Sequence, residues 1–436
     1  MNRRVVFIGM IVLCALVAAQ CAPPAAPATP TAVTRVKVSY VAFPDGSGLT
    51  DPVGQSLIDR FEADHPGIEI VRDTSDAFSY PLENHLAASP PPDIVAIAAD
   101  YLALSTIDRG SILDLGDMWK RLDLSKTYPA NFQAWRERDG KQYFLPIGYT
   151  WAAIYYNKRI FSRYNLKPPK TWDEFLVVCN TLQADGIPPI ALGWSFNFSG
   201  ATWWFDYLDL RLNGPQFHAD LVRGQARYDD PRAKKVFETW KDLLDGGYFT
   251  EGADTRSFLQ SLALVYDGKA AMILSDSSEV GGLPKEFQDE LDFFPFPIMD
   301  SGVPVGEVTR AFGYAIPAKA PHTALAMEFL DYIVSADAQT ALAQQSVQNR
   351  GTLPIHRGIE AAVLTPQARQ GLVLATGANY IGLQYISSFG TVGDPDGSGL
   401  LGYSAYYAFN RFLKDTNNLD SSLAALEEAR QKAFGK

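Results

Sequence analysis

A regular alternation of strand-like and helix-like segments near the N-terminus restricts the fold more than any other feature of this sequence. An alternating apolar segment, a helical pattern that ends at Pro66 and Gly67, a second strand, a second helix and a short buried strand follow one another. These segments lie, in order, at 35–43, 52–65, 68–71, 80–88 and 91–97. Strands that alternate with helices at this spacing pair in parallel, so the sequence predicts an α/β domain.

A second α/β series begins near Gly148. Its predicted helices lie at 172–182, 230–244, 255–267, 323–334, 337–345 and 421–433, and its predicted strands at 190–193, 270–274 and 310–317. Thr171 is the expected N-cap of the first helix, where Asp173 and Glu174 favour the positive end of the helix dipole. The order of the segments predicts two α/β lobes with more than one crossover between them.

The first 34 residues have the composition of an export signal followed by a tether. Arg3 and Arg4 precede an apolar run over 5–19, Cys21 follows, and 22–34 consists almost wholly of Ala, Pro and Thr. This order is typical of a bacterial lipoprotein signal peptide. The run is shorter than the roughly 20 residues that span a bilayer. We therefore expect a chain that begins at Cys21, carries lipid there and works outside the cytoplasm.

Gln20 keeps two other N-terminal outcomes open, because lipoprotein signals usually have Gly or Ala immediately before the Cys. A plain secretory signal cleaved nearby would leave a protein without lipid, and an uncleaved segment would act as an N-terminal anchor. All three outcomes export the folded part of the chain.

Charge and cysteine content exclude several kinds of partner and linkage. The chain has 38 basic and 49 acidic residues, a formal net charge of −11 and no basic stretch, so nucleic acid and anionic lipid surfaces are not expected partners. The cysteines are Cys14, Cys21 and Cys179. Lipidation of Cys21 would leave one thiol after export and therefore no internal disulfide. Cys179 is predicted to be a small buried hydrophobe in a helix.

Several separate stretches carry a family resemblance, and they occur in a collinear order over roughly residues 36–355. They are Phe61-Glu-Ala-Asp-His-Pro-Gly-Ile68, Pro92-Asp-Ile-Val95, Tyr155-Tyr-Asn-Lys158, Pro168-Pro-Lys-Thr-Trp-Asp-Glu-Phe175, Asp267-Gly-Lys-Ala-Ala-Met272 and 326–330. Together they resemble the family 1 extracellular solute-binding proteins, the sugar-binding components of bacterial ABC importers. Each stretch alone is a weak signal, whereas the set is specific.

The resemblance implies a two-lobed, periplasmic-binding-protein-like α/β clamp of the class II type, with hinge crossovers. Such lobes close on a ligand by hinge bending, and the closed form docks on the permease. The expected organisation is a signal peptide at 1–20, a tether at 21–35, lobe 1 at 36–148 and 309–350, lobe 2 at 149–308, and a C-terminal helical segment at 351–436 packed mostly on lobe 2.

The sequence departs from this family where an aromatic residue is expected. Many relatives carry Gly-x-Trp shortly after the Ala-Ala-Met strand, and that Trp helps to line the sugar cleft. Here the stretch reads Ser275-Asp-Ser-Ser-Glu279, so polar groups stand in its place. The departure leaves the identity of the ligand open.

Candidate ligand contacts follow from the rule that open α/β sheets bind ligands outside the carboxyl ends of their strands. Aromatic rings suit the apolar face of a sugar, and carboxylates and Arg suit its hydroxyls. On lobe 1 the candidates are Asp45, Ser47, Asp76, Phe78, Asp100 and Tyr101. On lobe 2 and the hinges they are Tyr149, Trp151, Trp194, Trp203, Trp204, Asp276, Arg310 and Phe312. Each Trp has a core position as its alternative, each Asp a turn or cap, and Arg310 an ion pair across the lobes.

Motifs for catalysis, cofactors and metals do not fit their required contexts. The histidines are scattered at His65, His85, His218, His322 and His356, without a His-Glu-x-x-His pattern, and there is no Gly-x-Ser-x-Gly elbow. The run 397–402 matches a dinucleotide fingerprint but follows no buried strand. The overlapping Asp394-x-Asp396 stretch resembles a calcium loop, yet Ala405 stands where its terminal Glu belongs. We therefore expect no enzyme, cofactor or metal.

These observations predict an exported, lipid-anchored, monomeric protein that captures a mono- or oligosaccharide and delivers it to an ABC permease. A binding protein for a peptide, a polyamine or another polar solute is the first alternative. A surface protein that works without a transporter is a second alternative, and a secreted glycoside-acting enzyme is a third.

Overall fold

The computed structural model describes most of the chain from residue 35 onward. The described residues are 35–42, 49, 52–73, 82–98, 106–107, 109–128, 137–138, 140–195, 199–222, 224–349, 351–354, 356, 359, 364–378, 380–382 and 400–434. Cys21, the predicted signal peptide and the predicted tether lie outside these residues. Within the described part, no helix is long and apolar enough to cross a membrane.

Lobe 1 is built on a parallel sheet of β1 (Val36–Val41), β2 (Ile68–Asp73) and β3 (Ile94–Ala98), with β1 in the centre. Its helices are α1 (Pro52–Asp64), α2 (Leu82–Ala87), α4 (Gly116–Arg121), α5 (Leu124–Thr127), α14 (Thr323–Ile333) and α15 (Ala336–Asn349). A small hairpin pairs β4 (Glu137–Arg138) with β5 (Lys141–Gln142). Phe61 of α1 meets Phe329 of α14 at a ring distance of 5.0 Å, which seals the core beneath the sheet.

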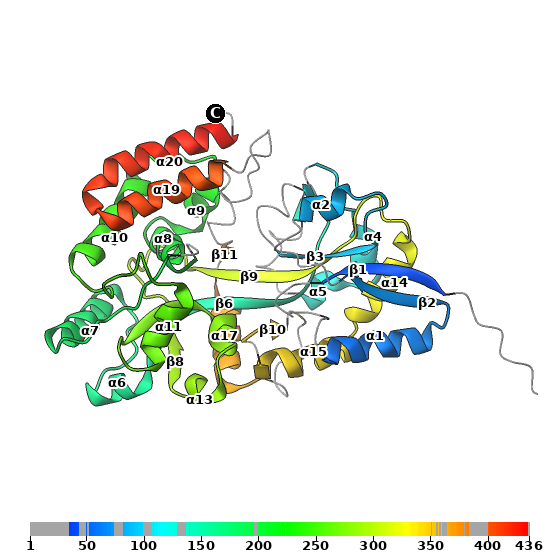
Figure 1. Cartoon of the computed structure of the whole chain (residues 1–436), viewed down its shortest axis with the longest axis horizontal. Helices are drawn as coiled ribbons and strands as arrows, with labels where there is room; N and C mark the ends of the chain where they lie inside the picture. The colour runs from blue at the N-terminus through cyan, green and yellow to red at the C-terminus, as the bar shows by residue number, and fades with distance from the viewer. Residues whose placement is uncertain are drawn as a thin grey trace, which may run out of the picture.

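Two long strands run from one lobe into the other. They are β6 (Leu145–Asn157) and β9 (Gly306–Ala315), which pair antiparallel and cross the middle of the molecule (Figure 1). In lobe 1, β9 also pairs with β3 and β6 pairs with β10 (Leu353–Pro354). In lobe 2, β6 pairs with β7 (Met272–Asp276) and β8 (Leu291–Phe294), and β9 pairs with β11 (Tyr380–Gly382).

Helices surround the strands of lobe 2. These are α6 (Lys158–Arg163), α7 (Trp172–Ala184), α8 (Ser199–Leu212), α9 (Gly214–Val222), α10 (Pro231–Asp245), α11 (Phe258–Tyr266), α12 (Ser277–Gly281) and α13 (Lys285–Gln288). Asn157 ends β6 and caps α6, accepting from the backbone N–H groups of Arg159 and Ile160. Thr171 and Glu174 form a capping box at the start of α7, as the sequence predicts for the cap.

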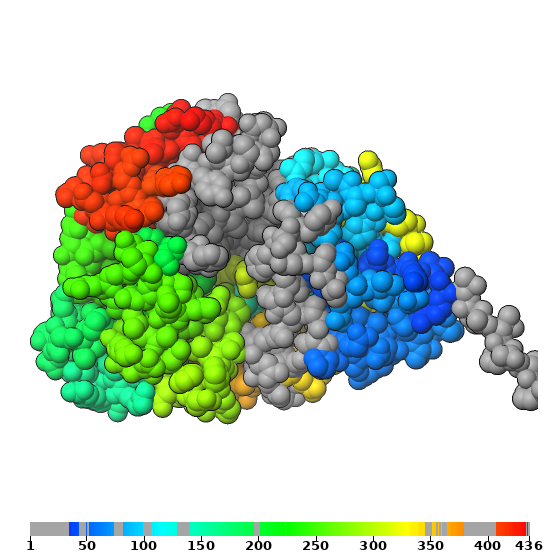
Figure 2. Space-filling model, in the orientation of Figure 1, coloured from blue at the N-terminus to red at the C-terminus, as the bar shows by residue number. Residues whose placement is uncertain are grey.

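The C-terminal segment returns to lobe 2. It comprises α17 (Pro366–Gly377), α19 (Leu400–Lys414), a 3₁₀ turn (Thr416–Asn418) and α20 (Leu419–Phe434). Phe409 and Phe412 of α19 pack on Phe237 and Trp240 of α10, with ring distances of 5.0 to 6.2 Å. The red surface in Figure 2 covers the upper outer face of lobe 2.

Most predicted elements are confirmed within a few residues, and two elements differ from the prediction. The predicted strand at 190–193 is only a pair of isolated bridges, from Ile190 to Phe249 and to Met272. Helix α8 was not predicted, because residues 201–211 are buried on every side and show no amphipathic period. Cys179 is buried in α7, as predicted, and burial raises the pKa of its thiol.

Candidate functional site

The two crossing strands pair only with each other at the midpoint between the lobes, among the residues that the structure describes. In β6, pairing with β10 ends at Tyr149 and pairing with β7 begins at Ala152. In β9, the described pairing with β11 reaches Val308, where the described residues of β11 stop, and pairing with β3 begins at Phe312. Between these limits, Thr150 faces Arg310 and Trp151 faces Thr309. We call these two pairs of residues the crossing pairs.

Asp276 ends β7 beside the crossing pairs, and both of its carboxylate oxygens accept hydrogen bonds. Its Oδ2 accepts from the Thr150 hydroxyl at 2.5 Å. Its Oδ1 accepts from the backbone N–H of Ser278 at 2.9 Å, so Asp276 is the N-cap of α12. The side chain is 6% exposed. Asp276, which the sequence predicts as a ligand contact, therefore lies next to the crossing pairs. There it caps a helix, which is the alternative role predicted for each Asp.

Ser277, the next residue after Asp276, also makes hydrogen bonds beside the crossing pairs. Its hydroxyl accepts from the backbone N–H of Trp151 at 3.1 Å and donates to the carbonyl of Gly351 at 2.6 Å. Sequence reasoning overlooked Thr150 and Ser277 as partners in this region. The available signal was the polar run at 275–279, where the family resemblance leads one to expect an aromatic residue.

Arg310 is the single exposed residue of β9, a strand in which every other position is buried. Its guanidinium makes no hydrogen bond or ion pair with the described residues, and the alternative of an ion pair across the lobes is not seen among them. Arg310 therefore offers planar donors at the junction of the lobes. Such donors suit hydroxyl and carboxylate oxygens.

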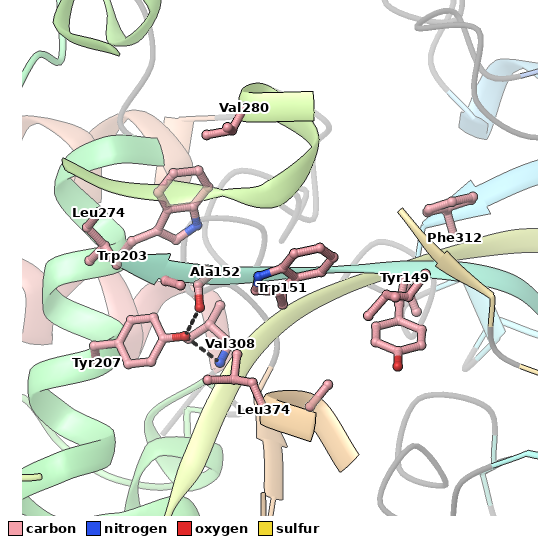
Figure 3. Packing of buried hydrophobic residues seen from close by; sticks show 14 of the residues in the cluster. Tyr149, Trp151, Ala152, Trp203, Tyr207, Leu274, Val280, Val308, Phe312 and Leu374 are labelled. Carbon is pink, nitrogen blue, oxygen red and sulfur yellow. Dashed lines mark hydrogen bonds between the residues drawn. The ribbon is translucent and has the colours of Figure 1, made fainter. Parts of the chain in front are cut away.

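Trp194 and Trp203 are the least buried of the four predicted tryptophans, although both belong to the core of lobe 2. The backbone N–H of Trp194 donates to the carbonyl of Ala253 at 2.9 Å, and its side chain is 6% exposed. The indole N–H of Trp194 is buried without a hydrogen-bond partner in the described part of the chain. Trp203 of α8 is 5% exposed and lies close to β7 and α12 (Figure 3).

The other predicted aromatic residues of lobe 2 and the hinges are buried as well. Trp204 contacts Phe249 and Phe296 of the lobe 2 core at ring distances of 5.3 and 5.5 Å and is 1% exposed. Trp151 packs against Gly371 of α17, where an added Cβ would lie 2.5 Å from the indole. Tyr149 and Phe312 are also buried, and both lie near Trp151 on the crossing strands (Figure 3).

The lobe 1 candidates lie outside the described residues; they are Asp45, Ser47, Asp76, Phe78, Asp100 and Tyr101. The strands that precede them are described. Parallel pairing aligns Val41 with Asp73 and with Val95, so the carboxyl ends of β1, β2 and β3 share one edge of the sheet. That edge is the one at which this fold class binds ligands.

Chemically, the described part of the site offers hydrogen-bond donors and aromatic surface. Arg310 supplies an exposed charged donor, whereas the indole N–H of Trp194 is buried. Among the described residues, no group of three or more His, Cys, Asp or Glu side chains is arranged to hold a metal ion. The arrangement is suited to binding a small polar molecule.

Fold and site together define a two-lobed protein whose lobes are joined by paired crossing strands beside a polar and aromatic edge. The sequence profile of the bacterial extracellular solute-binding proteins matches residues 42–340. The chain belongs to this family, as the resemblance of its motifs indicated.

Relatives of known sequence agree with this membership. An uncharacterised ABC transporter extracellular-binding protein of Pyrococcus horikoshii is 28% identical over 294 residues, which cover 65% of each chain. The multiple sugar-binding protein of Streptococcus mutans is 23% identical over 301 residues, or 66% of this chain and 69% of that protein. The match thus spans somewhat less than two thirds of the length of the archaeal relative.

Solved structures confirm the two-lobed fold. A bacterial solute receptor with an exclusive preference for β-D-galactopyranose superposes with a TM-score of 0.78 at 19% identity, covering 91% of this chain and 99% of that one. A chitin oligosaccharide binding protein gives 0.75 at 19% identity and covers 92% of this chain and all of that one. At such identities the likeness concerns the fold alone.

Proposed function

We propose that this protein captures a carbohydrate at the crossing between its lobes and delivers it to an ABC permease. The observation that carries the proposal is Arg310, an exposed cation without an ion pair among the described residues, which faces Thr150 in the crossing pairs. Family membership supports the binding role, and the ligands named for proteins of the same fold support the carbohydrate class.

The residues at the crossing suit the chemistry of a sugar. Hydroxyl groups pair with Arg310, and the C–H face of a pyranose stacks on an indole. Of the four predicted tryptophans, Trp194 and Trp203 are the least buried, with exposed fractions of 6% and 5%. Contacts from both lobes become simultaneous only when the lobes close, so ligand binding and closure are coupled.

A ligand panel tests the proposal. Thermal unfolding is measured with β-D-galactopyranose, raffinose, chitin oligosaccharides and other carbohydrates, and with dipeptides and spermidine as comparators. A ligand that binds only the folded protein raises the melting temperature by mass action. We expect a rise with one or a few carbohydrates. A rise with peptides or spermidine alone would assign the site to a different solute, and turnover of a glycoside would show an enzyme.

Adjacent tryptophans on α8 then test which ring stacks. Trp203→Phe removes indole area at a ring that is 5% exposed and packs edge-on against Phe258, whereas Trp204→Phe changes a ring that is 1% exposed. We expect the first variant to lower sugar affinity by about ten-fold, the loss of roughly one aromatic contact. The second should lower the melting temperature and keep the affinity. Isothermal titration and thermal unfolding separate the two effects, and equal affinity for Trp203→Phe and the wild type would remove Trp203 from the site.

We also propose that the protein is exported as a monomer and held at the membrane by lipid on Cys21. The signal-like sequence before this residue and the extracellular character of the family support the proposal. A tether of 21–35 would keep the binding lobes close to the permease. Intact mass of the mature N-terminus distinguishes a lipidated Cys21 from a plain cleavage product and from an uncleaved chain.

A further inference from the structure

Arg310 lies between the carboxyl end of a lobe 1 strand and the carboxyl end of a lobe 2 strand. Strand β3 follows β9 toward Arg310 and ends at Ala98. Strand β7 follows β6 toward Thr150 and ends at Asp276. Arg310 pairs with Thr150, so both residues lie between these two strand ends. Ligands of open α/β sheets bind beyond the carboxyl ends of strands, so Arg310 is placed where a ligand can meet both lobes.

The described carboxylates of lobe 2 that lie nearest along these strands already have donors. Both oxygens of Asp276 accept hydrogen bonds. Glu307, on β9 like Arg310, is buried and accepts from Arg211 at 2.7 Å. The hydroxyl of Tyr207, which also contacts a carbonyl of β6 at 2.5 Å (Figure 3), lies 2.9 Å from the same carboxylate. Among the described residues, Arg310 is therefore an exposed cation whose donors are still available.

The chemistry of a guanidinium favours a ligand group that only accepts hydrogen bonds. Arginine carries its N–H donors in a planar fork and has no acceptor. A sugar hydroxyl can meet one of these donors, whereas a carboxylate accepts two of them in parallel and carries the opposite charge. Closure of the lobes removes water from Arg310, and burying a cation without a counter-charge costs free energy. A carboxylate on the ligand would supply both the acceptors and the charge.

We propose that the ligand is an acidic carbohydrate, either a uronic acid or an oligosaccharide that contains one, and that Arg310 binds its carboxylate. Resting on the proposed carbohydrate-binding function, this role makes Arg310 a specificity-determining residue. It separates a uronate from the neutral hexose of the same stereochemistry, because the neutral sugar leaves the guanidinium without a matching acceptor and charge.

Matched pairs of ligands test this preference in the wild-type protein. Isothermal titration compares D-galacturonate with D-galactose, D-glucuronate with D-glucose, and trigalacturonate with its methyl ester. We expect the acid of at least one pair to bind about 10- to 100-fold more tightly than its neutral counterpart, the usual effect of a hydrogen bond to a charged group. Added salt should weaken the binding of the acid and leave that of the neutral sugar nearly unchanged.

Three variants then assign the preference to one side chain. Arg310→Gln removes the charge and should abolish the preference for the acid, with a much smaller change in affinity for the neutral sugar. Arg310→Lys keeps the charge but loses the planar fork, so it should keep part of the preference. Arg369→Gln is the matched control, because it makes the same change of charge at an exposed position on α17. It should keep the full preference.

The outcomes separate this proposal from the carbohydrate function on which it rests. If neutral sugars bind the wild type as tightly as their acids, the acidic ligand is overturned and the carbohydrate function stands. The charge of Arg310 would then be met from lobe 1, where Asp100 follows β3 outside the described residues. An equal loss of preference in Arg369→Gln would also overturn it, since net charge alone would explain the result. If no carbohydrate of either kind binds, both proposals fail.

Discussion

At the residue scale, exposure distinguishes Arg310 from every neighbour on its strand. The guanidinium makes no hydrogen bond or ion pair with the described residues that its removal would break. Arg310→Ala should therefore leave the melting temperature nearly unchanged and weaken carbohydrate binding about ten-fold or more, as expected for a hydrogen bond to a charged donor. Isothermal titration with the carbohydrate that shifts the melting temperature measures this loss. Arg163→Ala, an exposed change on α6, is the control; equal losses in both variants would contradict a direct role.

Asp206 is a single residue that makes the stability of the fold depend on pH. Burial raises the pKa of this carboxyl, Asp209 adds to the rise, and His218 opposes it. A group whose pKa is raised on folding stabilises the fold below its unfolded pKa, and this contribution is lost as pH rises through the folded pKa. Between about pH 4 and neutral pH, the wild type should lose melting temperature relative to Asp206→Asn. Asp64→Asn, at an exposed position, should follow the wild type; a flat difference between wild type and Asp206→Asn would refute the assignment.

At the element scale, α17 packs closely against Trp151 of the crossing pairs because Gly371 has no side chain. An added Cβ on Gly371 would lie 2.5 Å from the indole of Trp151, whereas nothing lies within 4 Å at Gly377. Ala normally stabilises a helix by about 1 kcal/mol relative to Gly. Gly371→Ala should instead destabilise the protein by about 1–3 kcal/mol, the usual cost of overpacking. Denaturant unfolding compares it with Gly377→Ala, which should be neutral or stabilising.

At the scale of the whole molecule, the C-terminal helices belong to the core of lobe 2. Phe412 is fully buried and contacts Phe237 and Trp240 at 5.0 and 5.5 Å. Phe412→Ala should lower the free energy of unfolding by about 3–5 kcal/mol because a buried aromatic ring leaves a cavity. Arg411→Ala, the exposed neighbour on α19, should change it little. If both variants unfold like the wild type, these helices do not contribute to the stability of lobe 2.

The elements that could be predicted are those whose sequence carries a local signal. Pro66 and Gly67 end α1, Thr171 caps α7 and Asp230 caps α10, and each acts through residues no more than a few positions away. Helix α8 lacks such a signal because it is buried on all sides and even its charged residues face the interior, so only its packing among β7, β9 and α10 accounts for it.

The sequence by itself determined the order of the elements that carry a local signal, the Thr171 cap and the family, since these depend on neighbouring residues and on collinear motifs. Only the tertiary structure decided that Trp204 and Trp151 are covered while Arg310 is open to solvent. The reason is physical: alternation along a strand defines two faces, but the elements packed on them decide which face is buried. The same holds for Tyr207, whose partners lie 55 and 100 residues away along the chain.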